Sequence, residues 1–418
     1  MTPQIKQRIE QIQRGEVPEG YKKTKVGIVP IEWEETRFKK MFSRLSRKNK
    51  ENNDNVLTIS AQYGLISQRD FFNKDIASDD KSNYFLLHKG EFAYNKSYSN
   101  GYPFGALKRL DMYNKGIVSP LYICFSANES NKCPDFYVHY FEAGMMNREI
   151  QAFAQEGARN HGLLNISVDD FFNSYLLMPS LPEQEKIAEI LSAQDRLIAL
   201  KEKLIEEKKR QKKALMQQLL TGKKRLPGFS DEWVDVKLGD IFAERVETNC
   251  QGLELLSVTG TNGVVPRSTI ETKDNSSEDK SKYLKICKGD IGYNTMRMWQ
   301  GVSALSDYEG IVSPAYTILV PSEKISAKYF SYLFKMHAVI FLFYRFSQGI
   351  VDDTRSLKYH EFAKLHLNVP SDKCEQEAIA KILTVSDKEL EILQRDLDQE
   401  KQKKKALMQL LLTGIVRI

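Results

Sequence analysis

The 418-residue sequence contains no long hydrophobic run, few cysteines and no motif of the kind that binds nucleotide phosphates. No stretch of 18 apolar residues occurs, so we expect no segment to span a membrane. The polar N-terminus, MTPQIKQRIEQIQRGE, lacks the apolar core of a signal peptide, and we expect a cytoplasmic protein. Five cysteines without a CxxC pair, and six scattered histidines without HExxH, argue against a zinc site or a disulfide framework.

The charge balance is only mildly basic, with 61 Lys and Arg against 55 Asp and Glu, for a net charge of +6. This balance permits nucleic-acid binding that is shared with partners but does not demonstrate it. GxxxxGK[ST] is absent, no glycine-rich cofactor loop follows a strand, and no paired carboxylates suggest a nuclease metal site. The sequence therefore argues against an ATPase, a self-contained methyltransferase or a nuclease.

What the sequence does contain is an internal duplication. QKKALMQQLLTG at 211–222 recurs as KKKALMQLLLTG at 403–414, an offset of 192 residues (414 − 222). PEQEKIAEIL at 182–191 recurs as CEQEAIAKIL at 374–383 with the same offset. Because the period is near half the chain, two large units are predicted and not a solenoid.

The similarity extends through the parts that precede these helices. YFLLHKGEFAYN (84–95) parallels YLKICKGDIGYN (283–294), GIVSPLY (116–122) parallels GIVSPAY (310–316), and Trp33 of PIEW parallels Trp233 of SDEW. Between the YN and GIVSP segments the two copies differ completely. Loops on a shared scaffold are where binding specificity usually resides, so the pattern predicts one task performed on two different targets.

Short runs rich in β-branched and aromatic residues, followed by helical stretches at 135–153 and 327–346, predict two similar globular domains of mixed α/β (α+β) fold. After each domain, apolar residues recur at spacings near three and four, from Ile187 to Leu219 and from Ile379 to Leu411. A helix with so narrow an apolar stripe needs a partner, and the simplest partner is its own duplicate, packed antiparallel as in a coiled coil. Gly222 and Gly414 follow the two helices in the usual capping position. The predicted segments are an N-terminal helical lead (1–21), a first domain (22–181), a central helix (182–222), a second domain (223–373) and a C-terminal helix (374–418).

This ordered set of motifs resembles the specificity subunits of type I restriction–modification systems. The resemblance is carried by the EQ-x-x-IA-x-IL helix starts, the ALMQ-x-LLTG helix ends, the KG-E/D and YN segments, the GIVSP-x-Y segments and the LPGFSDEW linker at 226–233. It covers nearly the whole chain, from about Gly20 to Gly414. No single motif is highly specific, but the ordered set, which occurs twice, is.

The resemblance implies a non-enzymatic subunit in which each domain reads one half of a bipartite site on double-stranded DNA. The helices would set the spacing of the half-sites; segment 183–219 would be roughly 55 Å long at about 1.5 Å per residue. They would also dock two identical methyltransferase subunits, through which two motor–nuclease subunits would join. S-adenosylmethionine, ATP and Mg would bind to those partners, and no cofactor would bind to this chain. The unlike loops predict an asymmetric target.

Base reading is expected where the two copies diverge. Arg and Lys can bond to guanine, Asn and Gln suit adenine, and aromatic side chains can stack or wedge. For any single residue, an ordinary surface position or a phosphate contact remains the alternative. The candidate DNA-binding residues are Lys96, Tyr98, Asn100, Tyr102, Arg159, Asn160 and His161 in the first domain, Arg297, Trp299, Gln300, Gln348 and Arg355 in the second, Gln62, Tyr63, Thr261 and Asn262 at matched Gly-flanked turns, and Lys223, Lys224 and Arg225 at the domain junction.

Other features have plainer explanations. Ser119-Pro120-Leu121-Tyr122 has one proline where amino-methyltransferases have two in the loop that holds a flipped base, so we favour a structural turn that leads into a core strand. The lysine runs near the helix C-termini suit the helix dipole and solvent. Two other functions remain as alternatives: a self-contained DNA methyltransferase or nuclease, and a coiled-coil scaffold with no role at DNA.

Overall fold

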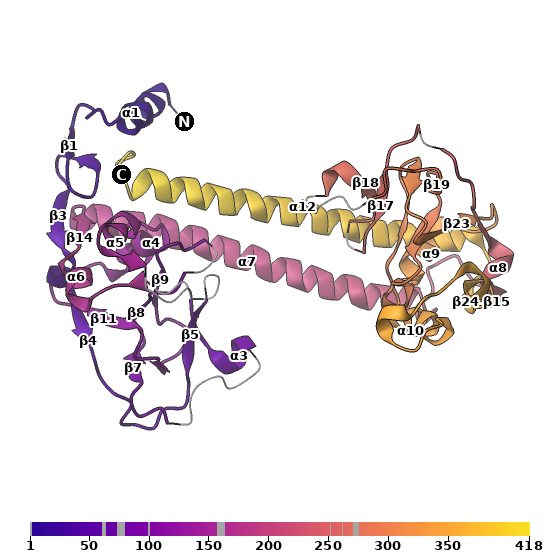
Figure 1. The fold of residues 1–418 in the computed structure, drawn as a ribbon, viewed down its shortest axis with the longest axis horizontal. Helices are drawn as coiled ribbons and strands as arrows, with labels where there is room; N and C mark the ends of the chain where they lie inside the picture. Colours follow the sequence, from indigo (N-terminus) through magenta and orange to yellow (C-terminus); the bar gives the residue numbers. More distant parts are fainter. Residues whose placement is uncertain are drawn as a thin grey trace. The chain divides into compact units, whose positions relative to one another are not determined.

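The computed structural model describes residues 2–60, 64–72, 80–98, 101–156, 164–250, 252–260, 262–270 and 276–418. The chain forms two compact units, one made of residues 1–201 and 396–418 and the other of residues 202–395. Two long helices, α7 (Leu181–Leu219) and α12 (Lys373–Leu411), run from one unit into the other (Figure 1). Each unit therefore holds one globular domain, the start of the helix that follows that domain, and the end of the other helix. The first unit is therefore not one continuous stretch of sequence, because residues 396–418 pack with residues 1–201.

A four-stranded antiparallel sheet forms the centre of each domain, and its strand order is the same in both, β4-β11-β8-β9 and β16-β23-β20-β21. The strands of the first sheet are β4 (Phe42–Leu45), β8 (Phe92–Asn95), β9 (Ala106–Arg109) and β11 (Ile123–Ala127). Those of the second are β16 (Phe242–Glu244), β20 (Ile291–Asn294), β21 (Ser303–Leu305) and β23 (Tyr316–Pro321). The shared order confirms the predicted duplication at the level of topology.

Two-stranded antiparallel ribbons surround each sheet, and three of them also occur in both domains. In the first domain they are β3 (Glu34–Arg37) with β14 (Tyr175–Met178), β5 (Leu57–Ser60) with β6 (Gly64–Ser67), and β7 (Phe85–His88) with β10 (Lys115–Val118). In the second they are β15 (Trp233–Lys237) with β24 (His366–Pro370), β17 (Leu256–Val258) with β18 (Val264–Pro266), and β19 (Leu284–Ile286) with β22 (Gly310–Val312). The first unit also contains β1 (Tyr21–Lys23) with β2 (Ile28–Pro30), and β12 (Gln155–Glu156) with β13 (Leu164–Asn165).

The predicted helical stretches each form two helices, because the chain turns between them. They are α4 (Pro134–Glu142) and α5 (Asn147–Phe153) in the first domain, and α9 (Ala327–Leu333) and α10 (His337–Phe346) in the second. The other helices outside the long pair are α1 (Pro3–Gln13), α2 (Phe38–Met41), α3 (Gln68–Phe72), α6 (Val168–Asn173), α8 (Leu238–Ile241) and α11 (Tyr359–Phe362). The 3-10 turns are η1 (Arg267–Thr269), η2 (Met298–Gln300) and η3 (Asp352–Thr354).

An aromatic core fills each domain and extends onto the long helices. Around Phe38 the rings of Phe42, Phe125 and Phe171 pack with centroids 4.7 to 5.0 Å apart. The same cluster includes Ile187, Ala188 and Leu191 from the start of α7 and Met408, Leu411 and Leu412 from the end of α12. The second core likewise takes Leu219 and Leu220 from the end of α7 and Ile379, Ala380 and Leu383 from the start of α12.

Within each unit the two long helices pack antiparallel, as the sequence predicts, and polar pairs cross the seam. In the first unit Lys404 pairs with Asp195 at 2.6 Å and Lys201 with Asp396 at 2.5 Å. Residue numbers therefore fall along α12 as they rise along α7. Half-exposed pairs of this kind stabilise little, but opposite charges at fixed positions select one register.

In the second unit Lys208 pairs with Glu389 at 2.6 Å, and Lys212 pairs with Asp387. The predicted apolar seam needs a correction in the middle of α7. Leu197 and Leu204 are exposed there, and Ile205 is the buried residue. Lysines of α7 occupy part of the seam and pair with acids of α12.

Each long helix starts with a buried carboxylate that is bound to the chain just beyond the end of the other helix. Glu183, whose side chain is 3% exposed, accepts from Arg417 at 2.5 and 3.1 Å, and Glu375, at 1%, accepts from Arg225 at 2.7 Å twice. The two pairs are related by the duplication, because 375 − 183 and 417 − 225 both equal 192. Gly414 follows α12 with φ +71°, and a Cβ there would lie 3.2 Å from the Trp33 ring. The matched tryptophans of the sequence thus cover the matched helix ends.

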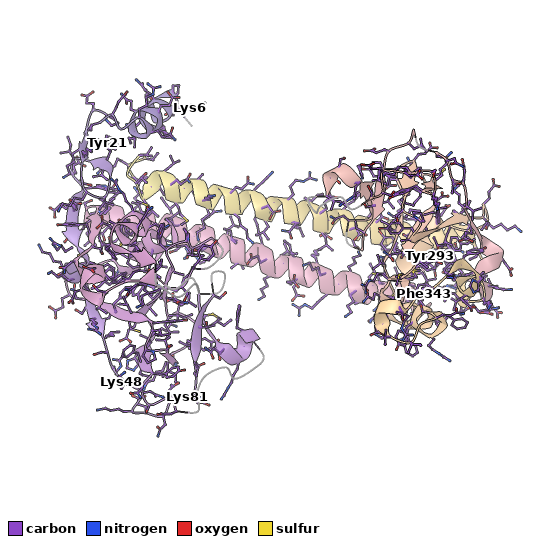
Figure 2. All side chains as sticks on the ribbon, in the orientation of Figure 1. Lys6, Tyr21, Lys48, Lys81, Tyr293 and Phe343 are labelled. Carbon is purple, nitrogen blue, oxygen red and sulfur yellow. The ribbon has the colours of Figure 1, made fainter. Side chains whose placement is uncertain are left out.

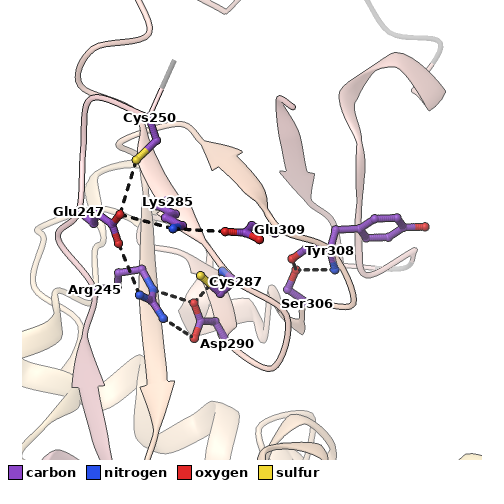
Figure 3. A network of polar contacts seen from close by, with 9 residues as sticks. All are labelled: Arg245, Glu247, Cys250, Lys285, Cys287, Asp290, Ser306, Tyr308 and Glu309. Atoms are coloured by element: carbon purple, nitrogen blue, oxygen red, sulfur yellow. Dashed lines mark hydrogen bonds and ion pairs between the residues drawn. The ribbon is translucent and has the colours of Figure 1, made fainter. Parts of the chain in front are cut away.

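The acid of the repeated KG-E/D segment has a structural role. In Figure 3, Asp290 accepts two hydrogen bonds from Arg245, at 2.8 and 3.1 Å, and one from the Cys287 backbone N–H at 2.8 Å. Glu91 of the first domain does the same, accepting from Arg47 and from the His88 backbone N–H at 2.6 Å. A carboxylate that closes a tight turn in this way explains why the motif keeps an acid in both copies.

The GIVSP segments form β10 and β22, and the turn after each of them leads into a strand of the central sheet, β11 or β23, as predicted. A Cβ on Gly116 would lie 2.4 Å from Leu57, and one on Gly310 would lie 2.5 Å from the Glu254 carbonyl oxygen. Glycine is therefore required by close packing against the neighbouring ribbon. All five cysteines are free, and no helix of the described residues is long and apolar enough to cross a bilayer.

At the junction of domain and long helix, the two copies use different chemistry at one equivalent position. In the second unit the hydroxyl of Tyr332 on α9 donates to Asp387 at 2.6 Å and lies 3.2 Å from Thr384. In the first unit His139 on α4 takes its place, with Nε2 3.0 Å from the Ser192 hydroxyl and Nδ1 3.7 Å from Asp195. Burial, aided by Lys404 and opposed by Asp195, holds the pKa of His139 below its usual value of 6.5.

We therefore expect the first unit to lose stability in mild acid. Because the folded state favours neutral His139, the unfolded chain binds the additional proton, and the unfolding free energy falls as the pH drops below about 6.5. Each pKa unit of separation corresponds to about 1.4 kcal/mol. Urea unfolding at pH 7.5 and 5.5 should show a smaller acid-induced loss for His139→Gln than for the wild type. The same substitution at exposed His337 is the control, and equal pH dependence in all three proteins would contradict the assignment.

Candidate nucleic-acid interface

In the second domain the chain between β20 and β21 forms a loop around η2 with an anchored interior and a polar surface. Met298 is buried, whereas Arg297 and Gln300 are exposed. Gly301 ends the turn at φ +80°, where a Cβ would lie 2.7 Å from Ile340 of α10. The loop is thus packed against a helix and presents two predicted base-reading side chains to solvent.

The other divergent segment of this domain, residues 347–357, lies beside the first. The Leu357 backbone N–H donates to the Thr295 carbonyl at 2.9 Å. Gln348 and Ser356 pair through their backbones at 2.8 and 2.7 Å, and this pairing closes the segment into a loop. Exposed Gln348 also donates from Nε2 to Glu361 at 3.2 Å. Tertiary structure thus joins two candidate segments that are about fifty residues apart in the sequence.

Tyr344 of α10 connects the two segments through its ring. The Arg355 guanidinium lies 4.1 Å from the ring centroid and donates to the Tyr344 hydroxyl at 3.3 Å. The Trp299 ring lies 6.0 Å from Tyr344 at an interplanar angle of 62°, and Phe341 stacks on Tyr344 at 6.5 Å. Both Phe341 and Tyr344 are exposed, whereas Phe343, labelled in Figure 2, belongs to the buried core. The Arg355 side chain is 15% exposed and also bonds Asp352 at 3.4 Å. The result is an aromatic surface with a partly covered cation.

Phe341 and Tyr344 are candidates that the sequence did not reveal. The run FLFYRF has aromatic residues on every face of the helix, and a helix that is apolar all round is usually buried. The available signal is the spacing of three between Phe341 and Tyr344, which places them on one face. Val339 and Phe343 are buried on the other face.

The equivalent loop of the first domain joins β8 to β9 and has different chemistry. Tyr98 is exposed, and burial lowers the pKa of half-buried Lys96. Tyr102 turns inward: its hydroxyl donates to Glu142 at 2.7 Å and accepts from Lys108 at 3.1 Å. Burial and Glu142 together raise the pKa of Tyr102 above its usual range. Tyr102 therefore contacts its own domain through its hydroxyl, and its predicted role at DNA stays a prediction.

The remaining candidates outside the domain junction lie either at the β17–β18 turn or outside the described residues. Asn262 is exposed at the turn between β17 and β18, where its backbone N–H donates to the Thr259 hydroxyl at 2.8 Å. The candidates that lie outside the described residues, and stay predictions, are Gln62, Tyr63, Asn100, Arg159, Asn160, His161 and Thr261.

A groove of about 1090 Å³ in the second unit has six lysines among the residues that line it. It lies between the end of α7, the β17–β18 turn, the start of β21 and α9. Asp307 and Asp387 are its acidic residues, and Lys212 neutralises Asp387. Basic residues along its walls are Lys209, Lys212, Lys213, Lys223, Lys328 and Lys335. Such a concentration of ammonium groups suits a polyanion.

The three basic residues predicted at the domain junction separate in the structure. Lys223 is exposed and lines the groove, and Lys224 is exposed as well. Arg225 instead binds buried Glu375 with both nitrogens, as described above. Its guanidinium thus already compensates a buried charge, and the phosphate contact predicted for Arg225 stays a prediction. In the described residues no cluster of three or more His, Cys, Asp or Glu could hold a metal ion.

Comparison with known proteins identifies the family. Residues 30–210 and 230–400 each match the Type I restriction modification DNA specificity domain. The chain belongs to this family. It carries two DNA specificity domains and is, as a specificity subunit, not itself an enzyme.

Similar proteins support this assignment over the full length. The chain is 23% identical to the putative type I restriction enzyme MjaX specificity subunit of Methanocaldococcus jannaschii, over 96% of this chain and 97% of that protein. It is 24% identical to the MjaVIII specificity subunit of the same organism, over 73% of this chain and 75% of the relative.

Two solved structures share the fold. One comes from work on complex assembly and conformational transition of the type I R-M system, with a TM-score of 0.55, 14% identity, and coverage of 93% of this chain and 99% of that one. The other is the S subunit of the type I system of M. genitalium, with a TM-score of 0.53, 14% identity, and coverage of 91% and 96%.

We predict that the second specificity domain depends on this aromatic surface and its partly covered cation. Removing the Arg355 or Tyr344 side chain (Arg355→Ala, Tyr344→Ala) should weaken binding to the cognate site by about 1–3 kcal/mol and relax selectivity in one half-site. Fluorescence anisotropy with the assembled complex measures this. Tyr308→Ala, which removes another exposed tyrosine of the same domain, is the matched control. Equal affinities for all four proteins would remove these residues from the interface.

Proposed function

We propose that each specificity domain reads one half of an asymmetric, gapped site on double-stranded DNA. The loop between β8 and β9 would do this in the first domain and the loop between β20 and β21 in the second, each together with the segments packed against it. One observation carries this proposal: in the second domain, two segments that diverge between the copies meet at Tyr344 and form one exposed surface. Arg297, Gln300 and Gln348 offer donors and acceptors on it. Their side chains suit guanine and adenine edges.

The groove supports the same proposal, because its lysines would contact the phosphates of the DNA backbone. Lysines bind the DNA backbone without regard to sequence and set the position of the protein on the duplex. In the second unit Lys213, Lys223 and Lys328 are exposed on the groove wall. Phosphate contacts there would hold the duplex while the Tyr344 surface reads base edges.

Asymmetry of the target follows from the difference between the two loops. The first domain presents Tyr98 and half-buried Lys96, while the second presents Arg297 and Gln300. Side chains with such different donor and acceptor patterns do not select the same bases. We therefore propose two different half-sites, and we expect the lengths of α7 and α12, each continuous between the units, to set the number of base pairs between them.

The helices support the proposal of two identical methyltransferase partners. Leu200 on α7 and Ile392 on α12 are 66% and 64% exposed, and they are related by the duplication, since 392 − 200 equals 192. Large exposed apolar side chains at equivalent places suit two copies of one apolar surface. Motor–nuclease subunits would join through these partners, and S-adenosylmethionine, ATP and Mg would bind to the partners. The complex would act on DNA in the cytoplasm.

Sequencing of modified bases tests the proposed function. Genomic DNA from cells with and without the gene for this chain is compared, both with its cognate methyltransferase expressed. Loss of methylation at a single gapped, asymmetric motif is the expected result. If no motif changes while the methyltransferase is present and active, the scaffold alternative replaces this proposal.

A second prediction concerns the partner stoichiometry. Leu200→Glu alone should reduce the bound methyltransferase from two copies to one, and Leu200→Glu with Ile392→Glu should abolish binding, because a carboxylate cannot be buried at an apolar contact without a partner. Light scattering after size exclusion gives the mass of each complex. Val246→Glu changes an equally exposed apolar residue of the second domain and serves as the control. Two bound copies on the double variant would show that the partners dock elsewhere.

A further inference from the structure

A pair of equivalent residues with opposite charge lies at the last residue of α4 and two residues beyond the end of α9. The equivalence follows from contacts: His139 and Tyr332 face Ser192 and Thr384 of the long helices. His139 and Tyr332 are 193 residues apart in the sequence (332 − 139). Three residues later in each helix segment, at the same offset, stand Glu142 and Lys335. One is an acid and the other a base, although the scaffold around them is duplicated.

Both residues bind the divergent loop of their own domain. Glu142 accepts a hydrogen bond from the Tyr102 hydroxyl at 2.7 Å and forms an ion pair with Lys108. Tyr102 lies in the loop, and Lys108 lies on the strand that follows it. Lys335 instead donates from Nζ to the carbonyl oxygens of Gly301 and Ser303, at 2.7 and 2.6 Å. Gly301 directly follows Gln300 in the loop of the second domain, and Ser303 is the first residue of β21.

Neither residue is explained by stability alone. The Lys335 amine is half-buried, and burial lowers its pKa to about 8, while its hydrogen-bond partners are two main-chain carbonyls. Burial also acts against Glu142, but Lys108 and Tyr102 outweigh it and hold the pKa of that carboxyl below its usual value. An apolar side chain would fill either place without the cost of dehydrating a charge. Buried polar groups of this kind can instead specify one conformation among several.

The chemistry at each position matches the loop that it faces. The first loop offers donors, a tyrosine hydroxyl and a neighbouring ammonium, to a carboxylate. The second offers carbonyl oxygens, and an ammonium donates to them. The residue at or just beyond the end of α4 or α9 therefore differs between the copies together with the loop, whereas the sheet around it does not.

We propose that Glu142 and Lys335 are positioning residues that fix the conformation of the recognition loop in their own domain and thereby set the sequence selectivity of one half-site each. This inference rests on the proposed function, because it takes these loops to be the parts that read DNA. Lys335 also lines the groove, so a direct phosphate contact is the competing role. The two roles predict different effects of a substitution. Loss of a phosphate contact lowers the affinity for every DNA sequence and reduces the salt dependence, whereas loss of a positioning residue lowers the discrimination between sequences.

The test uses the complete complex of this chain with its methyltransferase subunits. Anisotropy is measured on the cognate duplex and on duplexes with either half-site replaced, across a range of salt concentrations. Lys335→Met keeps the length of the side chain and removes its donors. We expect about a tenfold loss of discrimination in the second half-site, with the first half-site and the salt slope unchanged.

Other variants separate the two roles and check each domain. Lys335→Arg keeps the donors and should retain discrimination. Lys328→Met changes an exposed lysine of the same groove and should reduce the salt slope by about 0.9 with discrimination retained. In the first domain, Glu142→Leu should lose discrimination in the first half-site only, and Glu142→Gln, which still accepts hydrogen bonds, should retain most of it.

Outcomes of two kinds overturn the inference. The first is that Lys335→Met lowers the affinity equally for all duplexes and reduces the salt slope, which assigns Lys335 to a phosphate contact. The second is that Lys335→Met changes neither affinity nor discrimination. If this variant does not assemble, Glu142→Leu against Glu142→Gln decides, and equal discrimination in those two proteins overturns the inference as well. A wild-type complex that shows no sequence preference on any duplex would instead contradict the proposed function itself.

Discussion

The buried carboxylates at the starts of the long helices hold the rest of the structure in place. Glu183 and Glu375 are almost completely dehydrated, and each is compensated by an arginine that lies three residues beyond the glycine ending the opposite helix. Removing either arginine would leave a buried carboxylate without its counter-charge, which is destabilising. In each unit the pair joins the start of one long helix to the chain just beyond the end of the other.

The two copies keep this arrangement while varying its chemistry. Glu183 also accepts a hydrogen bond from the indole N–H of Trp33 at 2.9 Å, whereas the equivalent nitrogen of Trp233 is buried without a hydrogen-bond partner in the described structure. His139 of the first domain takes the place of Tyr332 at the contact between the domain and its long helix. A duplicated scaffold tolerates such exchanges because packing of the same helices supplies most of the stability. Positions that differ between the copies are then free to serve different targets.

The repeated motifs and the functional surface occupy different places. KG-E/D closes a turn, GIVSP requires a glycine beneath a leucine, and the ALMQ-x-LLTG ends seat a helix against a tryptophan. Similarity between the copies therefore marks structure. The Tyr344 surface, by contrast, is built from segments whose counterparts in the first domain have a different sequence, and it depends on the repeated parts for position. This separation allows a family to change its DNA target without changing its assembly.

The sequence by itself determined the duplication, the two long helices, the mixed fold and the family, because each depends on local periodicity or on motifs that occur twice. It also led to the prediction that the divergent loops read DNA. Only the tertiary structure decided which candidates meet. Arg225 and Tyr102 are polar residues in suitable places, but buried or half-buried carboxylates from distant segments bind them. Tyr344 became a candidate because the helix turns one aromatic face outward, and helix periodicity alone cannot say which face the fold covers.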